Sequence, residues 1–217
     1  MSRRAVVVGG SGGIGAAVVT RLASDGWDVS SLSRREGSDA SDEAQVADAF
    51  GRIEVLDALI YCAAVLIKKP VTELSAKDWD EQIGAGLRGA FLCAREAFRL
   101  MRGRGGSIVM VSSLSGVAGA EKFPGMSAYV AAKSGLAGLV EALAVEGRPD
   151  GIRVNAVSPG AVNTPMLRIA GVEGPRLEPD QVARVISWLA SSESEPLSGA
   201  NIRMDPPEVT GAGSRSC

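Results

Sequence analysis

The stretch VVVGGSGGIGAAV, residues 6–18, decides the fold of this chain. Its valine run is typical of a buried strand, and small apolar residues at helical spacing follow the glycines. Gly9, Gly13 and Gly15 stand in a G-x3-G-x-G pattern between the two. Because glycine has no Cβ, the backbone there can turn sharply and approach a pyrophosphate at the N-terminus of the helix. The stretch predicts a strand–turn–helix unit that binds a dinucleotide; a tight turn without a ligand is the alternative.

Short apolar runs alternate with amphipathic segments along the rest of the chain. Strands are predicted over residues 5–8, 27–33, 56–62, 107–112, 152–157 and 200–204. Helices are predicted over residues 14–24, 43–50, 78–101, 128–146 and 179–190. Because strands that alternate with helices favour parallel βαβ units, we predict a single α/β domain over residues 1–205. Its fold class is a Rossmann-type, doubly wound parallel sheet with helices on both faces.

Two regions depart from a complete sheet of this type. Residues 33–56 have room for only one short helix, where a helix and a further strand are usual. The sheet is therefore expected to be shortened at the edge between its second and third predicted strands. Residues 206–217 are polar and rich in Gly and Ser, and we expect them to form a flexible tail.

The composition excludes several classes of function. The 217 residues carry a net charge of −2, so no polycationic surface indicates nucleic acid or an anionic membrane as a partner. The apolar run near the N-terminus is too short for a signal sequence or a membrane span. The three cysteines are far apart and there is no histidine. Neither a disulfide scaffold nor a metal site is therefore expected, and a cytoplasmic location is favoured.

The absence of histidine also limits proton-transfer chemistry. Any group that moves a proton near neutral pH must be a Tyr, Lys, Cys, carboxylate or water. In SAYVAAKSG, residues 127–135, Tyr129 and Lys133 are four residues apart and share one helix face. An ammonium beside the phenol is expected to lower the pKa of Tyr129. A half-buried Tyr and a surface Lys are the alternatives for each residue taken alone.

The end of the second predicted strand bears on the choice of dinucleotide. An acidic residue there would bind the ribose 2′-hydroxyl of NAD, but the sequence reads Ser33-Arg34-Arg35. A hydroxyl and a guanidinium suit a 2′-phosphate, so NADP(H) is predicted in preference to NAD(H). The alternative is two solvated surface arginines, one of them neutralised by Glu36.

Three segments, in the order found here, carry a family resemblance. Ser113 lies in VSSLSG, Tyr129 and Lys133 form Tyr-x3-Lys, and NAVSPGAVNT follows at residues 155–164. With the glycine turn, they resemble the main single-domain branch of the short-chain dehydrogenase/reductase family over residues 5–205. The resemblance implies that Tyr129 gives a proton to a carbonyl oxygen as hydride arrives from the nicotinamide. It also implies that Lys133 bonds the nicotinamide ribose and that Ser113 holds the substrate oxygen.

The same resemblance implies a set of cofactor-binding positions. Asp39 would lie beside the adenine ring, and residues 159–164 would frame the nicotinamide and the phosphates. The expected cofactor-binding residues are Gly9, Ser11, Gly13, Ile14, Gly15, Ser33, Arg34, Asp39, Ala63, Ala64, Lys133, Pro159, Gly160, Val162 and Thr164.

Departures from the family pattern affect the expected chemistry. Gly86 stands where the family usually has an Asn that holds a helix kink and a proton-relay water. Tyr61 and Ala64 lie in a segment that is usually Asn-Asn-Ala-Gly, and Tyr61 is expected to have a buried structural role. Residues 164–179 are short for a substrate lid, whereas residues 118–126 are extended and expected to form part of a substrate wall. A short lid leaves room for a bulky substrate or for one that is bound to a carrier.

The function predicted is that of an NADP(H)-dependent ketoreductase or alcohol dehydrogenase acting on a small-molecule carbonyl or alcohol. Gly86 and the short lid leave open non-redox chemistry on the same fold, such as that of a cyclase, dehydratase or isomerase. A non-catalytic partner subunit is the remaining alternative. A homodimer or homotetramer is expected by analogy, paired through the two predicted helices over residues 78–101 and 128–146. These carry small residues that permit close approach: Gly84, Gly86, Gly89, Gly135 and Gly138.

Overall fold

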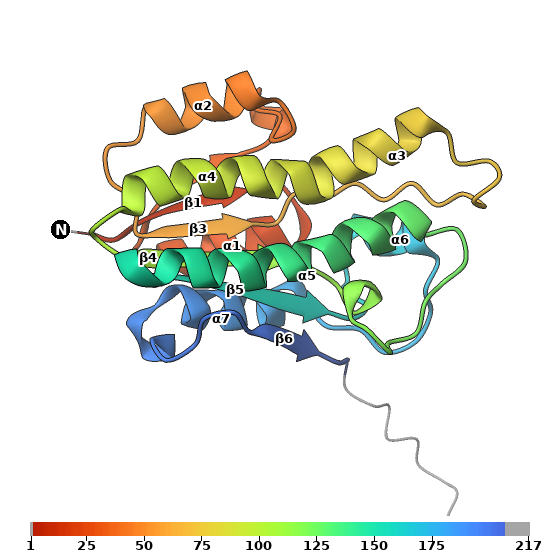
Figure 1. Ribbon diagram of the computed structural model, residues 1–217. Coiled ribbons are helices and arrows are strands. Elements are labelled where there is room, and N and C mark those ends of the chain that lie inside the picture. The colour runs from red at the N-terminus through yellow and green to blue at the C-terminus, as the bar shows by residue number, and fades with distance from the viewer. Residues whose placement is uncertain (1, 207–217) are drawn as a thin grey trace, which may run out of the picture.

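A six-stranded sheet forms the centre of the computed structural model, which describes residues 2–206. Every strand pair is parallel, and the strand order is β2-β1-β3-β4-β5-β6 (Figure 1). The tail predicted over residues 206–217 lies outside the described residues except for Pro206. The strands are β1 (Arg4–Val8), β2 (Asp28–Leu32), β3 (Ala58–Tyr61), β4 (Gly106–Val111), β5 (Ile152–Pro159) and β6 (Asn201–Met204).

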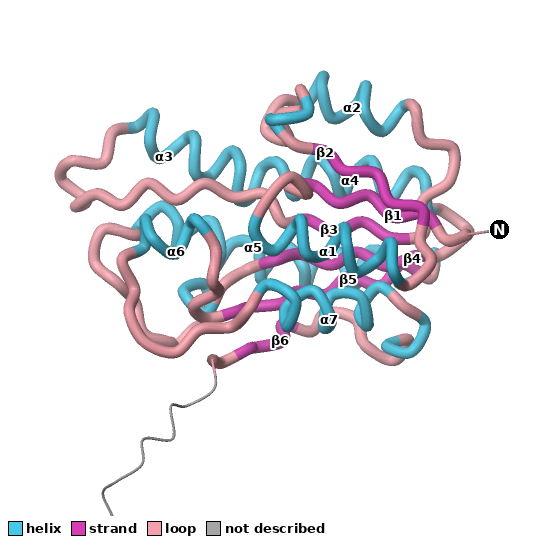
Figure 2. The backbone as a smooth tube through the Cα atoms, turned by 180° about the vertical axis from the view of Figure 1, so that it is seen from behind, coloured by secondary structure: helices cyan, strands magenta, loops and turns pink. Residues whose placement is uncertain are grey.

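Helices cover both faces of this sheet, as the alternating pattern predicts. On one face lie α1 (Gly13–Ser24) and α7 (Pro179–Ala190), which pack against each other (Figure 2). On the other face lie α2 (Glu43–Gly51), α4 (Gly89–Met101) and α5 (Ser127–Gly147) (Figure 1). The predicted doubly wound α/β fold is therefore confirmed.

The strands are buried from both sides, which explains why they are continuous apolar runs in the sequence. In β3, Leu59 and Tyr61 enter the core under α4 and α5. Ala58 and Ile60 enter the core under α1 and α7. Each face of the sheet therefore has its own core, and a site can form only at the ends of the strands.

The sheet ends at β2, as the short interval after it predicts. Within residues 2–206, no strand lies beyond β2, and residues 33–57 hold only a 3-10 turn and α2. Asp42 caps the N-terminus of α2 by accepting hydrogen bonds from the amides of Ala44 and Gln45. Arg95 on α4 pairs with Glu43 on α2 at 2.8 Å. These contacts fasten the shortened edge to the body of the domain.

Two further helices lie beyond the carboxyl ends of the strands (Figure 1). α3 (Ala76–Ile83) follows a long loop after β3, and its capping box joins Ser75 and Asp78. α6 (Pro165–Ala170) occupies part of the interval expected to form a short lid. This interval thus holds a single short helix, which Lys68 fastens by donating a hydrogen bond of 2.6 Å to the carbonyl of Ala170.

The long helix predicted over residues 78–101 is present, but a π-helical segment interrupts its α-helical repeat. α3 runs without a break into a π-helical segment, Gly84–Arg88, which then continues as α4. This π segment packs closely on α5, since a Cβ added to Gly86 would lie 3.0 Å from the Cβ of Ala132. A π turn adds one residue to the helical repeat. Such turns are often found at functional sites. Because the apolar spacing on either side continues, the sequence pattern alone does not show the interruption.

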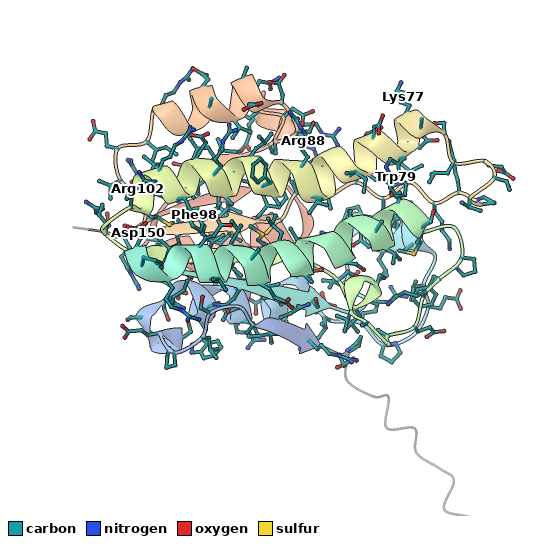
Figure 3. The ribbon with its side chains drawn as sticks, viewed as in Figure 1. Lys77, Trp79, Arg88, Phe98, Arg102 and Asp150 are labelled. Carbon is teal, nitrogen blue, oxygen red and sulfur yellow. The ribbon has the colours of Figure 1, made fainter. Side chains whose placement is uncertain are left out.

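Two polar side chains hold the π segment. The hydroxyl of Tyr61, which is fully buried, donates a hydrogen bond of 2.6 Å to the carbonyl of Ala85. Arg88, labelled in Figure 3, donates to the carbonyl of Ser41 in the loop before α2 and lies 3.9 Å from the carboxylate of Glu43. The buried structural role expected for Tyr61 is confirmed, and the π segment is tied to the shortened edge.

Tyr61→Phe is expected to destabilise the fold without touching a reacting group. The change leaves the Ala85 carbonyl without its hydrogen-bond donor, which should lower the free energy of unfolding by about 1–3 kcal/mol. Urea unfolding followed by circular dichroism measures this difference. Tyr129→Phe, at the only other tyrosine, is the matched control and should change the midpoint less. Equal midpoints for Tyr61→Phe and the parent would show that this bond does not stabilise the π segment.

The length and apolarity of α5 have a structural cause. By length and composition alone, the helix is long and apolar enough to cross a membrane. In this fold it packs on β5, and side chains such as Leu136 and Val140 are fully buried in the core. Its apolar character is therefore accounted for by packing against the sheet.

Candidate active site

The glycine turn between β1 and α1 depends on the missing Cβ atoms. Gly9 has φ of +82°, and an added Cβ would lie 2.7 Å from the amide nitrogen of Ala63. A Cβ on Gly15 would collide with the carbonyl oxygen of Gly9. The turn therefore closes tightly against the end of β3, and the N-terminus of α1 stays open for an anionic group.

A cavity of about 410 Å³ lies against this turn, and we call it the glycine-turn cavity. It is bounded by the glycine turn, the residues after β2 and β3, and the start of α5. Of the expected site residues, it is lined by Gly9, Ser11, Gly13, Ile14, Gly15, Ser33, Arg34, Asp39, Ala63, Ala64, Tyr129, Lys133 and Thr164.

A second cavity of about 870 Å³ lies beside the first, and we call it the large cavity. It is bounded by the loop after β4, α6 and the end of β6. The remaining expected site residues line it: Ser113, Pro159, Gly160 and Val162. The residues shared by both linings are Ile14, Ser112, Tyr129, Thr164 and Met166. The two cavities therefore meet at Tyr129.

Burial dominates the titration of Tyr129. The side chain is only 9% exposed, and desolvation raises the pKa of its phenol, while a hydrogen bond with Ser113 partly opposes the rise. The expected lowering of this pKa by Lys133 is therefore wrong. The cause is geometric: the Lys133 ammonium donates a hydrogen bond of 2.7 Å to the carbonyl of Val111 and lies 5.7 Å from the centre of the Tyr129 ring.

Lys133 is the most deeply buried ammonium in this part of the fold. It is 2% exposed, and burial lowers its pKa from 10.5 to about 8. Its backbone carbonyl accepts a hydrogen bond of 3.0 Å from Ser112. Gly116 packs against the same backbone, because a Cβ there would lie 2.6 Å from the Lys133 carbonyl carbon. The fold therefore sets both the position of the Lys133 ammonium and its pKa. With a pKa of about 8, the group loses its proton close to neutral pH.

Ser113 is fixed by the turn that follows β4. It is the N-cap of the 3-10 turn Leu114–Gly116, and its Oγ accepts a hydrogen bond of 3.2 Å from the amide of Ser115. Its hydroxyl also makes the hydrogen bond with Tyr129, so the two hydroxyl groups lie next to each other at the large cavity. Ser113 and Lys133 thus lie on the two sides of Tyr129, one in each cavity.

The far end of the glycine-turn cavity carries two guanidinium groups. Arg34 lies 3.6 Å from Glu81 on α3, and its side chain is 58% exposed. Arg35 donates a hydrogen bond of 3.4 Å to the carbonyl of Ser11. Glu36 does not neutralise either arginine, contrary to the alternative weighed from sequence, but accepts hydrogen bonds from Ser31 and Ser33. Both arginines therefore remain on the cavity lining.

Asp39 is held by hydrogen bonds within its own loop. It lines the glycine-turn cavity, and one carboxylate oxygen accepts hydrogen bonds from the amide and the hydroxyl of Ser41. The Asp39 amide donates a hydrogen bond of 2.9 Å to the side chain of Gln45. These hydrogen bonds hold the loop between β2 and α2 in place, although no further strand of the described chain lies beside it.

The residues present fit a nicotinamide dinucleotide. The glycine turn can close against β3 only because Gly9 and Gly15 have no Cβ, and it forms one wall of the glycine-turn cavity. Guanidinium groups and a helix N-terminus supply the positive charge that a phosphate needs. Within residues 2–206, no group of three His, Cys, Asp or Glu residues is placed to hold a metal ion.

Sequence reasoning misses part of the lining. Arg35 is not among the expected cofactor-binding residues, although it contacts the glycine turn directly. Ser112 and Met166 line both cavities, and Leu66 and Phe123 line the large one. Leu66 and Phe123 come from loops without periodic pattern, and α6, which carries Met166, is too short to show one, so no sequence signal identifies these residues.

Comparisons with known proteins agree with this geometry. A family model described as enoyl-(acyl carrier protein) reductase matches residues 36–206. The chain is 32% identical over 240 residues to an acetoacetyl-CoA reductase of Allochromatium vinosum, covering 93% of this chain and 96% of the relative. It is 36% identical over 176 residues to a trans-4-hydroxycyclohexanecarboxylate dehydrogenase of Sinomonas cyclohexanicum, covering 77% and 66%.

A solved structure supports the same assignment. The ligand-free aldohexose dehydrogenase of Thermoplasma acidophilum is 25% identical to this chain, with a TM-score of 0.86 and coverage of 94% of this chain and 92% of that one. The glycine turn, the strand order and the family model therefore all indicate the same family, and together they cover most of the described chain. The chain belongs to the short-chain dehydrogenase/reductase family, a family of nicotinamide-dependent oxidoreductases.

Proposed function

We propose that the protein is an NADP(H)-dependent ketoreductase or alcohol dehydrogenase that acts on a small-molecule carbonyl or alcohol. The observation that carries the proposal is the meeting of the two cavities at Tyr129. The dinucleotide would occupy the glycine-turn cavity, and the substrate would occupy the large cavity. Tyr129 would then touch the reacting carbonyl at the junction.

When bound, the nicotinamide supplies or accepts the hydride. Tyr129 would give its proton to the carbonyl oxygen, and its raised pKa means that the phenol still holds that proton at neutral pH. Ser113 would donate a hydrogen bond to the same oxygen and stabilise the charge that develops on it. Lys133, which lines the cofactor side, would hold the nicotinamide ribose with the ammonium hydrogens that Val111 does not occupy.

The preference for NADP(H) is supported by the far end of the glycine-turn cavity. Arg34 and Arg35 both line it, and a guanidinium binds phosphate oxygens in a bidentate geometry. The carboxylate of Glu36 is held by two serine hydroxyls and is not part of the lining. This arrangement favours a 2′-phosphate over a free 2′-hydroxyl.

Paired calorimetric titrations with NADPH and NADH test the cofactor assignment. We expect both to bind and NADPH to bind more tightly. Tighter binding of NADH would overturn the 2′-phosphate assignment alone. Failure of both to bind would contradict the whole proposal, because the glycine-turn cavity would then not be a dinucleotide site.

Arg34→Gln is expected to weaken NADPH binding by about 10-fold or more, since a charge-assisted hydrogen bond contributes about 1.5–3 kcal/mol. NADH lacks the 2′-phosphate, so its dissociation constant should change little. The same calorimetric titration measures both values. An equal loss for the two cofactors would show that Arg34 supports the loop and does not read the phosphate.

Glu81→Gln and Asp80→Asn separate the role of Arg34 from that of its ion pair. Glu81 lies 3.6 Å from Arg34, whereas no ion pair joins Asp80 to Arg34 within residues 2–206. Removing the Glu81 charge frees the guanidinium, so NADPH should bind as tightly as before or more tightly. Asp80→Asn makes the same charge change one residue away and should have no effect.

We also propose a cytoplasmic homodimer or homotetramer. Of the glycines noted on the two long helices, Gly138 alone has open space beside it, because a Cβ on Gly84, Gly86, Gly89 or Gly135 would meet atoms of the same chain. Support comes mainly from exposed apolar side chains, Phe91 on α4 and Val145 on α5. Analytical ultracentrifugation tests the assembly, and a monomer at micromolar concentration would contradict it.

A further inference from the structure

The wall of the large cavity beside Tyr129 is apolar. Leu66, Met126 and Ala170 are buried and pack with Tyr129 in one cluster. Phe123 and Met166 pack against the same cluster and line the cavity. These residues come from two separate loops and α6, so a substrate near the reacting oxygen is surrounded by hydrocarbon on several sides.

The charged residues of the lining are mostly acidic. Glu121, Glu173 and Asp205 line the large cavity, together with one cation, Arg203. Arg203 pairs with Asp205 at 3.3 Å. Within residues 2–206, Glu121 and Glu173 have no ion-pair partner. An anionic group in this cavity would therefore meet two unpaired carboxylates and one guanidinium that is already paired.

Two lysines lie near this region without lining the cavity. The ammonium of Lys68 donates to the carbonyl of Ala170. The ammonium of Lys122 donates to the carbonyls of Val117 and Ala120. Both ammonium groups are thus bound to carbonyls of residues that line the cavity, Ala170 and Ala120, although neither lysine is itself a lining residue. A carboxylate of a ligand would have to compete with these carbonyls for the ammonium groups.

From these observations we infer that the large cavity selects neutral, apolar ketones and secondary alcohols and discriminates against substrates that carry a carboxylate or a phosphate. The inference rests on the proposed function and names its substrate class. An anion that leaves water for an apolar site without a paired cation is strongly disfavoured. Glu121 and Glu173 add repulsion at the lining, which makes them residues that determine specificity.

A matched pair of ketones tests the charge selection. 4-Oxocyclohexanecarboxylate and its methyl ester have the same ring and the same reacting carbonyl, and only the acid is charged at pH 7. With NADPH in excess, kcat/KM for the ester should exceed that for the acid by about 10-fold or more, which corresponds to about 1.4 kcal/mol. Because the repulsion is electrostatic, the preference should shrink in 0.5 M salt.

Variants assign the preference to the two carboxylates. The double variant Glu121→Gln/Glu173→Gln should reduce the ester-to-acid ratio several-fold, mainly by raising kcat/KM for the acid. Glu54→Gln is the matched control, because Glu54 is exposed and precedes β3, at the opposite end of the strands from the site. That control should leave the ratio unchanged.

The outcomes separate this inference from the proposed function. Equal or faster turnover of the acid would overturn the charge selection and leave the reductase intact, as would a ratio that the double variant does not change. No turnover of either ketone would instead contradict the proposed function. In that case ligand-observed NMR with Tyr129→Phe protein, which needs no reaction, decides the inference: binding of the ester in preference to the acid supports it, and the reverse overturns it.

Discussion

Tyr129→Phe is expected to lower kcat for carbonyl reduction by about 10²–10⁴-fold, the usual contribution of a positioned general acid. The variant keeps the ring that packs beside Leu66 and Met126 and loses only the hydroxyl that holds the transferable proton. Steady-state reduction of a cyclic ketone, followed by NADPH absorbance, measures the effect. The dissociation constant of NADPH should stay close to that of the parent, because the glycine turn and the arginines are unchanged.

The result also bears on direction. Because burial raises the pKa of Tyr129, the phenol is protonated at neutral pH and suited to reduction. Residual kcat within a few-fold of the parent would rule out Tyr129 as the proton donor. Ser113→Ala should give a smaller loss in the same assay, since it removes one hydrogen bond to the substrate oxygen and no transferable proton.

Lys133→Met is expected to give a protein that is at least as stable as the parent and nearly inactive. The fall in the Lys133 pKa from 10.5 to about 8 means that the charged form is less stable in the folded chain than in the unfolded chain. At pH 7 this lowers the free energy of unfolding by about 3 kcal/mol. Methionine removes this cost but also removes the charge-assisted hydrogen bond to Val111, which contributes about 1.5–3 kcal/mol. The free energy of unfolding should therefore rise by up to about 1.5 kcal/mol at pH 7, while kcat falls by about 10²-fold or more.

The pH dependence gives this prediction a second readout. Between pH 8 and pH 10.5 the unfolded chain holds a proton on Lys133 that the folded chain has released. The stability contributed by this group in the parent protein therefore rises with pH through that window, and the advantage of Lys133→Met shrinks. Urea unfolding of the parent and of Lys133→Met at pH 7 and pH 9.5 measures the stability difference at each pH. A variant that is less stable than the parent at pH 7, by the same amount at both pH values, would contradict the burial cost.

Most of the fold could be predicted because its signals are local. The valine run before Gly9 is buried on both faces, and the turn after it requires glycine at Gly9 and Gly15, so strand, turn and helix are each encoded in adjacent residues. The shortened edge could be predicted from length alone, since residues 33–57 cannot hold a helix and a further strand. The four-residue spacing of Tyr129 and Lys133 likewise fixes their shared helix face.

What could not be predicted depends on contacts between distant residues. The π segment follows from the packing of Gly86 on Ala132 and from the Tyr61 hydroxyl, neither of which alters the apolar spacing. The direction of the Tyr129 pKa shift was wrong because spacing does not give burial or the orientation of the Lys133 ammonium. These features required the three-dimensional structure.

The adenosine end of the site shows the same limit. Arg34 forms an ion pair with Glu81, which lies on a different element. Glu36 is adjacent to the arginines in sequence, but its carboxylate accepts hydrogen bonds from Ser31 and Ser33 instead of pairing with them. The cavity walls from loops had no periodic signal at all. Sequence therefore identified the chemical groups, whereas the structure determined which of them meet.

The most direct test of the central claim is deuteride transfer that depends on Tyr129. Protein is incubated with NADPH carrying two deuterium atoms at the nicotinamide C4 and with the methyl ester of 4-oxocyclohexanecarboxylate, and the product is analysed by mass spectrometry. The account predicts one deuterium on the carbinol carbon of the alcohol product, formed at a rate that falls by about 10²–10⁴-fold in Tyr129→Phe. Absence of deuterium in the product with the parent protein, or transfer that Tyr129→Phe leaves undiminished, would contradict it.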